Sequence, residues 1–313
     1  MRTKRKGEFL VQTKIKVPVI SSAYRNVYLP SADVYRGINT PSFQNGVKYD
    51  HWIVNDFTMI KDGGDCWHAY GITHPKPPTF TDDFHFVGDV HEAEYQLFHC
   101  TFNGTLEELC NGESFIEQEK VLYPQSRPGE RPECWAPCIV EKDELYYLFY
   151  TPETVHIAKT SDMYHFTPHP NGVFSGDSFL RDPYVFFEDG IYTMIYVTEN
   201  LYCRTSIDLI HWGEEQLFQA NPFGPNSSQE SPCLFKRHGI YYLMWCIYDG
   251  QNGCYDNRTY IFAANSLNEF TGKAPIAMLK GHAPEIISEN GQDYIVSVYY
   301  PQNGLNIAKI MWE

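Results

Sequence analysis

The chain has 313 residues, with 24 Lys and Arg against 39 Asp and Glu, and a net charge of −15. This acidic balance excludes a nucleic-acid surface as the main function, because binding phosphates requires clustered Lys and Arg. Apolar residues form 43% of the sequence, enough for a sizeable core, and its 23 Tyr and 20 Phe favour strands over helices.

One phrase recurs along the chain, and its copies predict the fold. Each copy has a short first strand, a turn with Gly or charged residues, and a Tyr-rich second strand. The four clear copies begin at Trp135-Ala136-Pro137, Arg181-Asp182-Pro183, Glu230-Ser231-Pro232 and His282-Ala283-Pro284, and a degenerate copy begins at Asn55-Asp56-Phe57. The clear copies start roughly 50 residues apart, which is in the range of β-propeller blades.

A third strand follows in each of the four clear copies, at residues 155–158, 201–204, 259–263 and 305–308. A Ser/Asp turn with an aromatic residue comes next at 161–166 and 206–212, as is typical of a connection into an outer strand. We therefore predict an all-β fold, a five-bladed β-propeller with four-stranded antiparallel blades, as a single domain over residues 1–313.

The last copy reaches only its third strand before Glu313, and an unpaired strand edge promotes aggregation. Residues 9–17 alternate between apolar and polar side chains, as a strand does. We expect this strand, within an N-terminal closing segment of residues 1–50, to close the ring on the fifth blade.

The first copy carries extra length between Thr73 and Pro132, and loops of that size often have a function. Glu94 and His99 lie in this insertion. Both could reach a central channel, although no spacing rule supports this.

Three carboxylates stand at the start of first strands, namely Asp56, Asp182 and Glu230. First strands line the channel of a propeller, so we expect the three groups to share a register and to converge. Neighbouring carboxylates raise one another's pKa, and we expect the pKa of Glu230 to be raised in this way and by burial. Glycoside hydrolysis uses such a set, with one protonated acid and one carboxylate as base or nucleophile. An Asp before Pro also caps or turns a strand, so each residue alone is equally compatible with a structural role.

Over residues 50–313 the chain resembles the five-bladed-propeller glycoside hydrolases of families 43 and 62 and of families 32 and 68. Trp135-Ala136-Pro137 resembles the second-blade motif of family 43. The segment from Trp52 through Asn55 to Asp56 resembles the Trp-x-Asn-Asp-Pro motif of family 32, whose Asp is the nucleophile.

Three further motifs carry the resemblance. Arg181-Asp182-Pro183 matches the Arg-Asp-Pro motif of family 32, whose Asp stabilises the transition state. Glu230-Ser231-Pro232 resembles the Glu-Gly-Pro of family 43 and the Glu-Cys-Pro of family 32, whose Glu is the general acid. Gly281-His282 resembles the fifth-blade Gly-His of family 43, whose His helps to hold a central water or calcium ion. The chain departs from these families at Phe57, which replaces the Pro after the first Asp, and at Ser231, which replaces Gly or Cys.

The resemblance implies a set of site residues. Asp56, Asp182 and Glu230 are the expected catalytic residues, and the expected substrate-binding residues are Trp52, Asn55, Trp135, Arg181 and His282. No cofactor is required, although His282 could bind a structural calcium ion in the channel. Trp67 and His51 also flank the expected pocket and could stack on a sugar ring, but tryptophan in a strand is as often part of the core.

The predicted function is a glycoside hydrolase that cleaves terminal arabinofuranosyl, fructofuranosyl or xylosyl linkages of an oligo- or polysaccharide. Inversion is favoured by the family 43-like architecture, which makes Asp56 the base and Glu230 the acid. Two alternatives stay open: a catalytically inactive carbohydrate-binding propeller, and a glycoside phosphorylase. The phosphorylase needs a basic phosphate pocket, for which Arg181, Arg204 and Arg258 are the candidates.

The sequence also predicts a cytoplasmic location. Glu8 and Lys14 interrupt any apolar run after the basic N-terminal residues, so a secretory signal is not visible. The nine cysteines are odd in number and form no CxxC pair, which favours free thiols in a reducing compartment. No stretch approaches the apolar length of a membrane span, so no membrane partner is expected.

Overall fold

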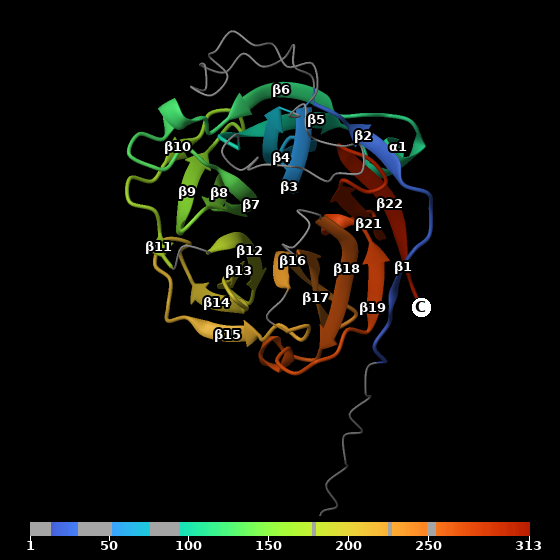
Figure 1. Ribbon diagram of the computed structural model, residues 1–313. Coiled ribbons are helices and arrows are strands. Elements are labelled where there is room, and N and C mark those ends of the chain that lie inside the picture. The colour runs from blue at the N-terminus through green and yellow to red at the C-terminus, as the bar shows by residue number, and fades with distance from the viewer. Residues whose placement is uncertain (1–13, 31–51, 76–93, 177–179, 225–226, 249–254) are drawn as a thin grey trace, which may run out of the picture.

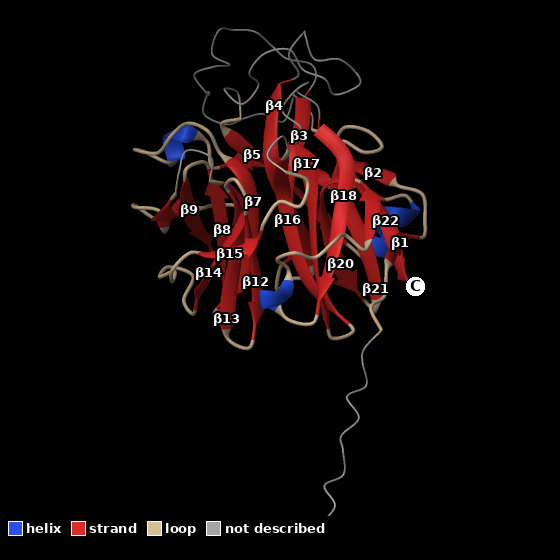
Figure 2. Cartoon of the chain, turned by 60° about the horizontal axis from the view of Figure 1, so that its bottom comes forward, coloured by secondary structure: helices blue, strands red, loops and turns tan. Residues whose placement is uncertain are grey.

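Five antiparallel sheets surround a common axis in the computed structural model, which describes residues 14–30, 52–75, 94–176, 180–224, 227–248 and 255–313 (Figure 1). The predicted five-bladed β-propeller is confirmed. Figure 2 shows that strands dominate the described chain and that helices are short. Among the described residues, no helix has the length and apolar character needed to cross a membrane.

The blades follow one another in chain order. Blade one has β3 (Trp52–Lys61), β4 (Cys66–Pro75), β5 (Gln96–Asn103) and β6 (Ile116–Val121), with the helix α1 (Leu106–Asn111) between the last two. Blade two has β7 (Trp135–Lys142), β8 (Leu145–Thr151) and β9 (Thr154–Thr160), with β10 (Thr167–Pro168) and β11 (Phe174–Ser175) on its outer edge. Blade three has β12 (Arg181–Glu188), β13 (Ile191–Val197), β14 (Leu201–Ser206) and β15 (Gln216–Gln219).

Blade four has β16 (Ser228–Arg237), β17 (Ile240–Tyr248), β18 (Tyr255–Ala264) and β19 (Ala277–Lys280). Blade five has β20 (His282–Glu289), β21 (Gln292–Val298) and β22 (Leu305–Trp312). Short 3₁₀ turns at Pro124–Ser126 and Leu267–Glu269 complete the described elements.

The outer edge of β22 pairs with two short N-terminal strands, β1 (Pro18–Ile20) and β2 (Arg25–Tyr28). Before β1, the backbones of Val17 and Glu313 exchange two hydrogen bonds of 3.0 Å. The expected closing strand at 9–17 differs from this: residues 9–13 lie outside the described part, and residues 14–17 form no strand. Pro18 opens β1, where its missing N–H does not interrupt the ladder.

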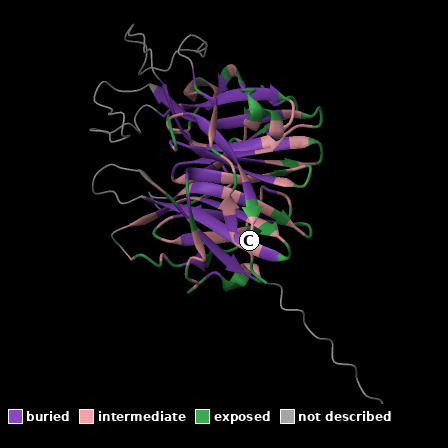
Figure 3. Cartoon of the chain, turned by 90° about the vertical axis from the view of Figure 1, so that its right-hand side faces the viewer, coloured by how far each residue is buried: buried purple, intermediate pink, exposed green. Residues whose placement is uncertain are grey.

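The core consists of five apolar clusters, and each lies between two adjacent blades. The Tyr-rich second strands supply large members of these clusters, and Tyr70, Tyr150, Tyr196 and Tyr242 are fully buried. Figure 3 shows the buried strands as continuous bands through the molecule. Alternating aromatic residues therefore pack one blade against the next.

A β-bulge interrupts the first strand of every blade. The ladder shifts between Val54 and Phe57 in blade one and at the matching place in the other four blades. In those four, the second bulge residue has a positive φ and the next is proline; the φ values are 42° at Ala136, 56° at Asp182, 51° at Ser231 and 45° at Ala283. Proline cannot donate to a ladder, so within a sheet it is tolerated at a bulge.

Candidate active site

The three expected carboxylates occupy successive positions of the bulge rather than one shared position. We count the bulge positions from the last paired residue before the shift, which is Val54 in blade one, Arg181 in blade three and Glu230 in blade four. On this count Glu230 is at the first position, Asp182 at the second and Asp56 at the third, where the other blades carry proline. The expected common register is therefore wrong. Blade one has no proline to mark its bulge. When the five repeats are aligned by sequence alone, Phe57 falls at the place of the proline, although in the structure Phe57 lies one residue after that place.

The bulges nevertheless bring two of these carboxylates to one small cavity on the axis. The cavity has a volume of about 30 Å³, room for roughly one water molecule. Its lining residues are Asp56, Phe57, Ala136, Pro137, Asp182, Pro183, Tyr184, Ser231, Pro232, Cys233, Ala283, Pro284 and Glu285. All five inner strands contribute to it, so the cavity marks the channel of the propeller.

Ser231 connects Asp56 to Asp182. Its hydroxyl donates a hydrogen bond to Oδ1 of Asp56, and its backbone N–H donates to Oδ2 of Asp182 at 3.0 Å. The positive φ of Ser231 belongs to the bulge, and this residue reaches both blade one and blade three from blade four.

Arg181 connects Asp182 to Glu230. Its Nε lies 3.6 Å from Oδ2 of Asp182, and its Nη2 lies 3.6 Å from Oε1 of Glu230. Nη2 also donates to the hydroxyl of Ser228 at 2.6 Å and to the carbonyl of Gln229 at 3.2 Å. A continuous polar network therefore runs from Asp56 through Ser231, Asp182 and Arg181 to Glu230.

The pKa of Asp56 is raised to about 7. Burial is the largest cause, followed by the charge of Asp182, while the hydrogen bond from Ser231 opposes the shift. The charge of Glu94 raises the pKa further and that of Arg181 lowers it. A carboxyl that titrates near neutral pH can give and take a proton during a reaction. The expected rise for Glu230 stays a prediction.

Glu94 is a fourth carboxylate at this site, and only its place in the insertion indicated a role. It precedes β5, its side chain is 2% exposed, and Oε1 lies 3.9 Å from Nε2 of His74. Its carbonyl accepts a hydrogen bond of 2.8 Å from the N–H of Cys134, which ties the insertion to blade two. Nothing in the spacing of the sequence assigns Glu94 to Asp56, because Asp56 lies on β3 whereas Glu94 lies in the connection before β5.

Tyr299 is a residue of this site that sequence reasoning missed. The residue is buried, has a φ of 60° and lies just after β21. Burial, followed by the charges of Glu94, Asp56 and Glu230, raises the pKa of its hydroxyl well above the usual value. The sequence shows Tyr299 only as the last of a run of strand residues, which gives no signal for a site.

Among the remaining predicted residues, Arg181 belongs to the network and Asn55 is buried directly before Asp56. His282 is fully buried, with its ring centroid 5.3 Å from that of Tyr299. No group of three or more His, Cys, Asp or Glu side chains within the described ranges could hold a metal ion. Binding of a calcium ion by His282 stays a prediction.

The tryptophan residues that were expected to contact the sugar make contacts within the protein. Trp52 is buried, and the Nζ of Lys120 on the outermost strand β6 lies 4.9 Å from its ring centroid. Trp135 begins β7 and packs against the cluster between blades one and two. Trp67 donates its indole N–H to Glu289 at 3.2 Å, at the far end of β4 from the bulge. His51 lies outside the described residues.

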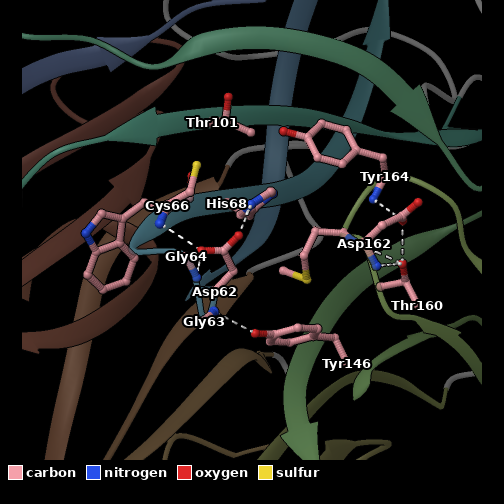
Figure 4. Close-up of polar contacts among 12 residues, drawn as sticks. Asp62, Gly63, Gly64, Cys66, His68, Thr101, Tyr146, Thr160, Asp162 and Tyr164 are labelled. Atoms are coloured by element: carbon pink, nitrogen blue, oxygen red, sulfur yellow. Dashed lines mark hydrogen bonds and ion pairs between the residues drawn. The ribbon is translucent and has the colours of Figure 1, made fainter. Parts of the chain in front are cut away.

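His99 does not reach the channel. Its Nε2 lies 3.0 Å from Nδ1 of His68, its ring stacks on Tyr70 at 4.6 Å, and burial lowers its pKa to about 3. His68 in turn lies 3.4 Å from Asp62, and Figure 4 shows this pair facing Tyr164 and Asp162 of blade two. His99 is therefore part of the contact between blades one and two.

No protein-family model and no curated protein matches the chain. Solved structures do match it by fold. A family 43 β-xylosidase/α-arabinofuranosidase from a compost microbial metagenome, in complex with xylotriose, matches with a TM-score of 0.62 and 13% identity, over 93% of this chain and 95% of that one.

Two longer proteins also match. One is a family 43 arabinoxylan arabinofuranohydrolase from Bacillus subtilis in complex with cellotetraose, with a TM-score of 0.59 and 12% identity. The other is the family 32 β-fructofuranosidase of Bombyx mori, with a TM-score of 0.58 and 15% identity. The matches cover 78% and 83% of this chain but only 58% and 62% of those two. The fold is that of the five-bladed-propeller glycoside hydrolases. The resemblance drawn from the sequence motifs is confirmed at the level of the fold.

Proposed function

We propose that the chain is a glycoside hydrolase whose reaction is carried by Asp56, Asp182 and Glu230. The supporting observation is the continuous network from Asp56 to Glu230 at the start of the inner strands. Because the pKa of Asp56 is raised to about 7, this carboxyl changes its charge in the pH range where the reaction would run.

In the proposed mechanism, Glu230 donates its proton to the leaving oxygen of the glycosidic bond. Asp56 accepts a proton from a water molecule, whose oxygen bonds to the anomeric carbon as the bond to the leaving group breaks. Asp182 positions the sugar, and Arg181 orients both Asp182 and Glu230. The product has an inverted anomeric configuration.

The proposed substrate carries a terminal arabinofuranosyl, fructofuranosyl or xylosyl unit. Support comes from the structural neighbours, which include a β-xylosidase/α-arabinofuranosidase, an arabinofuranohydrolase and a β-fructofuranosidase. Two of them were solved with oligosaccharides.

The two alternatives have less support. A phosphorylase needs cations available to phosphate, but two of its three candidates lie beside carboxylates: Arg181 is 3.6 Å from both Asp182 and Glu230, and Arg204 is 3.7 Å from Glu215. A propeller that only binds carbohydrate has no need of the three carboxylates, and all three are present.

The test is a release assay with 4-nitrophenyl α-L-arabinofuranoside, 4-nitrophenyl β-D-xyloside, sucrose and arabino-oligosaccharides. We expect hydrolysis of at least one substrate, and Glu230→Gln should reduce the rate by several orders of magnitude on oligosaccharides. The loss should be much smaller on the nitrophenyl glycosides, because nitrophenolate leaves without protonation. Equal losses on both kinds of substrate would contradict the acid role of Glu230.

NMR of the first product tests the proposed inversion separately. Early appearance of the anomer of retained configuration would make Asp56 a nucleophile. That result would leave the hydrolase assignment in place.

A further inference from the structure

A hollow of about 520 Å³ opens beside Arg181 at the start of blades three and four. Its wall on the side of the site contains Arg181 and Ser228. These two residues are hydrogen-bonded to each other at 2.6 Å, and Arg181 also lies 3.6 Å from Oε1 of Glu230. The hollow is therefore next to the proposed acid.

The position of the acid decides which part of a substrate the hollow would hold. A general acid must come within hydrogen-bond distance of the oxygen that it protonates. That oxygen belongs to the leaving group, so the leaving group begins beside Glu230, on the side where the hollow lies. This argument rests on the role proposed for Glu230 above.

A second hollow lies beside the first. It has a volume of about 360 Å³, shares Thr198 and Glu199 with the first, and is also lined by Ser175, Gly176, Tyr202, Arg204 and Glu215. Residues 198–200 connect β13 to β14, so both hollows border this turn. Each has the size of a small-molecule site, and we call the pair the blade-three groove.

The lining of the first hollow fits a neutral, hydroxyl-rich ligand. The side chains that form it are mainly amides and hydroxyls, namely Thr198, Asn200, Asn221, Ser227 and Ser228. These groups donate and accept hydrogen bonds, as sugar hydroxyls do. Asn200 accepts from the N–H of Asn221 at 2.9 Å, and Asn221 donates to the carbonyl of Ser227 at 2.8 Å, so the floor is held in place before a ligand arrives.

The second hollow adds an aromatic ring and a compensated charge pair. Tyr202 packs partly against the apolar cluster between blades two and three and is partly exposed where it lines the hollow, and an aromatic ring is a surface on which a sugar can stack. Arg204 lies 3.7 Å from Glu215 and donates to the carbonyl of Gly213 at 2.8 Å, so this end offers little net positive charge to an anion.

We infer that the blade-three groove binds the leaving-group side of an oligosaccharide, with one sugar unit in each hollow. The substrate then has at least two units beyond the bond that is cleaved. A trisaccharide fills both hollows, a disaccharide fills the first, and a 4-nitrophenyl glycoside places only its aryl ring there.

The experiment compares kcat/KM for the di-, tri- and tetrasaccharides of the arabino, xylo and fructo series with that for the matching 4-nitrophenyl glycoside. We expect at least a tenfold gain from di- to trisaccharide and little gain from tri- to tetrasaccharide. Tyr202→Ala should remove most of the gain at the trisaccharide and leave the disaccharide and the nitrophenyl glycoside unchanged. Tyr202→Phe keeps the ring and should retain the gain.

A charge variant supplies an independent arm. Glu199 is exposed and lines both hollows, so Glu199→Gln should weaken di- and trisaccharide turnover about three- to tenfold while sparing the nitrophenyl glycoside. Its matched control is Glu141→Gln, an exposed glutamate near the end of β7 that is remote from its bulge, which should change neither. Equal kcat/KM for di- and trisaccharide, or equal losses on all substrates, would overturn the inference.

A binding measurement distinguishes failure of this inference from failure of the proposed function. Calorimetric titration of the Glu230→Gln protein with xylotriose, arabinotriose and kestose should show binding of at least one, and this binding should weaken when Tyr202→Ala is added. If no glycoside is hydrolysed but this pattern holds, the hydrolase proposal fails and the groove stands. If hydrolysis occurs without the trisaccharide preference, the groove fails and the hydrolase stands. Absence of both hydrolysis and binding overturns both.

Discussion

Ser231 lowers the pKa of Asp56 through one hydrogen bond, against the larger effects of burial and Asp182, so removal of its hydroxyl has a defined direction. Ser231→Ala removes the hydroxyl that donates to Asp56, an interaction that holds the pKa of Asp56 down. That pKa should rise, so the acid limb of the kcat/KM profile should move to higher pH. Hydrogen bonds to charged groups contribute about 1.5–3 kcal/mol, so we expect a loss of roughly 10- to 100-fold on the acid side. An unchanged acid limb would contradict the role of Asp56 as the ionised base.

Removal of the charge of Glu94 should change the pKa of Asp56 in the direction opposite to Ser231→Ala. Its charge raises the pKa of Asp56, so Glu94→Gln should lower that pKa and move the acid limb to lower pH. The variant keeps the size of the side chain and removes its charge. A pH profile measured beside that of Ser231→Ala provides the control, because a general disturbance of the site would not give shifts of opposite sign. Shifts in the same direction would show that Glu94 does not tune Asp56.

At the level of the element, the bulge determines which side chains face the axis. The residue that follows the bulge proline lines the channel cavity in the last three blades, as Tyr184, Cys233 and Glu285. Glu285 is the only carboxyl at this place. Its Oε2 accepts a hydrogen bond of 3.1 Å from the N–H of Met59. Burial raises its pKa to about 8, against the opposing hydrogen bonds from Met59 and Thr58.

This pKa predicts how stability depends on pH. A folded-state pKa above the unfolded value means that the folded protein holds the proton more tightly. The contribution of Glu285 to stability is therefore complete below about pH 4.5 and declines up to about pH 8, by at most about 1.4 kcal/mol per pH unit. Glu285→Gln should remove this decline, so that the variant gains on the wild type as the pH rises from 5 to 8. Urea unfolding across that range measures the difference, with the exposed Glu141→Gln as control. Parallel curves for variant and wild type would refute the shift.

At the level of the whole molecule, the repeat in the sequence predicts the number and order of the blades because the Tyr-rich strands and their turns recur in register. The position of Asp56 could not be predicted in the same way, since blade one has a bulge without the proline that marks the others. Glu94 could be named from its place in the insertion, but nothing in the sequence assigned it to Asp56. Tyr299 could not be predicted, because it follows β21 of blade five and the charges that act on it belong to Glu94 and Asp56 of blade one and Glu230 of blade four, a proximity that no local pattern records.

The five apolar clusters have a consequence for how this molecule can change. Each apolar cluster takes its residues from two neighbouring blades, so no blade has a core of its own. Removal of one blade would therefore expose the apolar faces of both of its neighbours. A linear array of repeats can gain or lose a unit at its end, because only one interface is affected. A ring has no such end. Loss or gain of a single blade would therefore disturb two interfaces at once, so the closed ring fixes the number of blades.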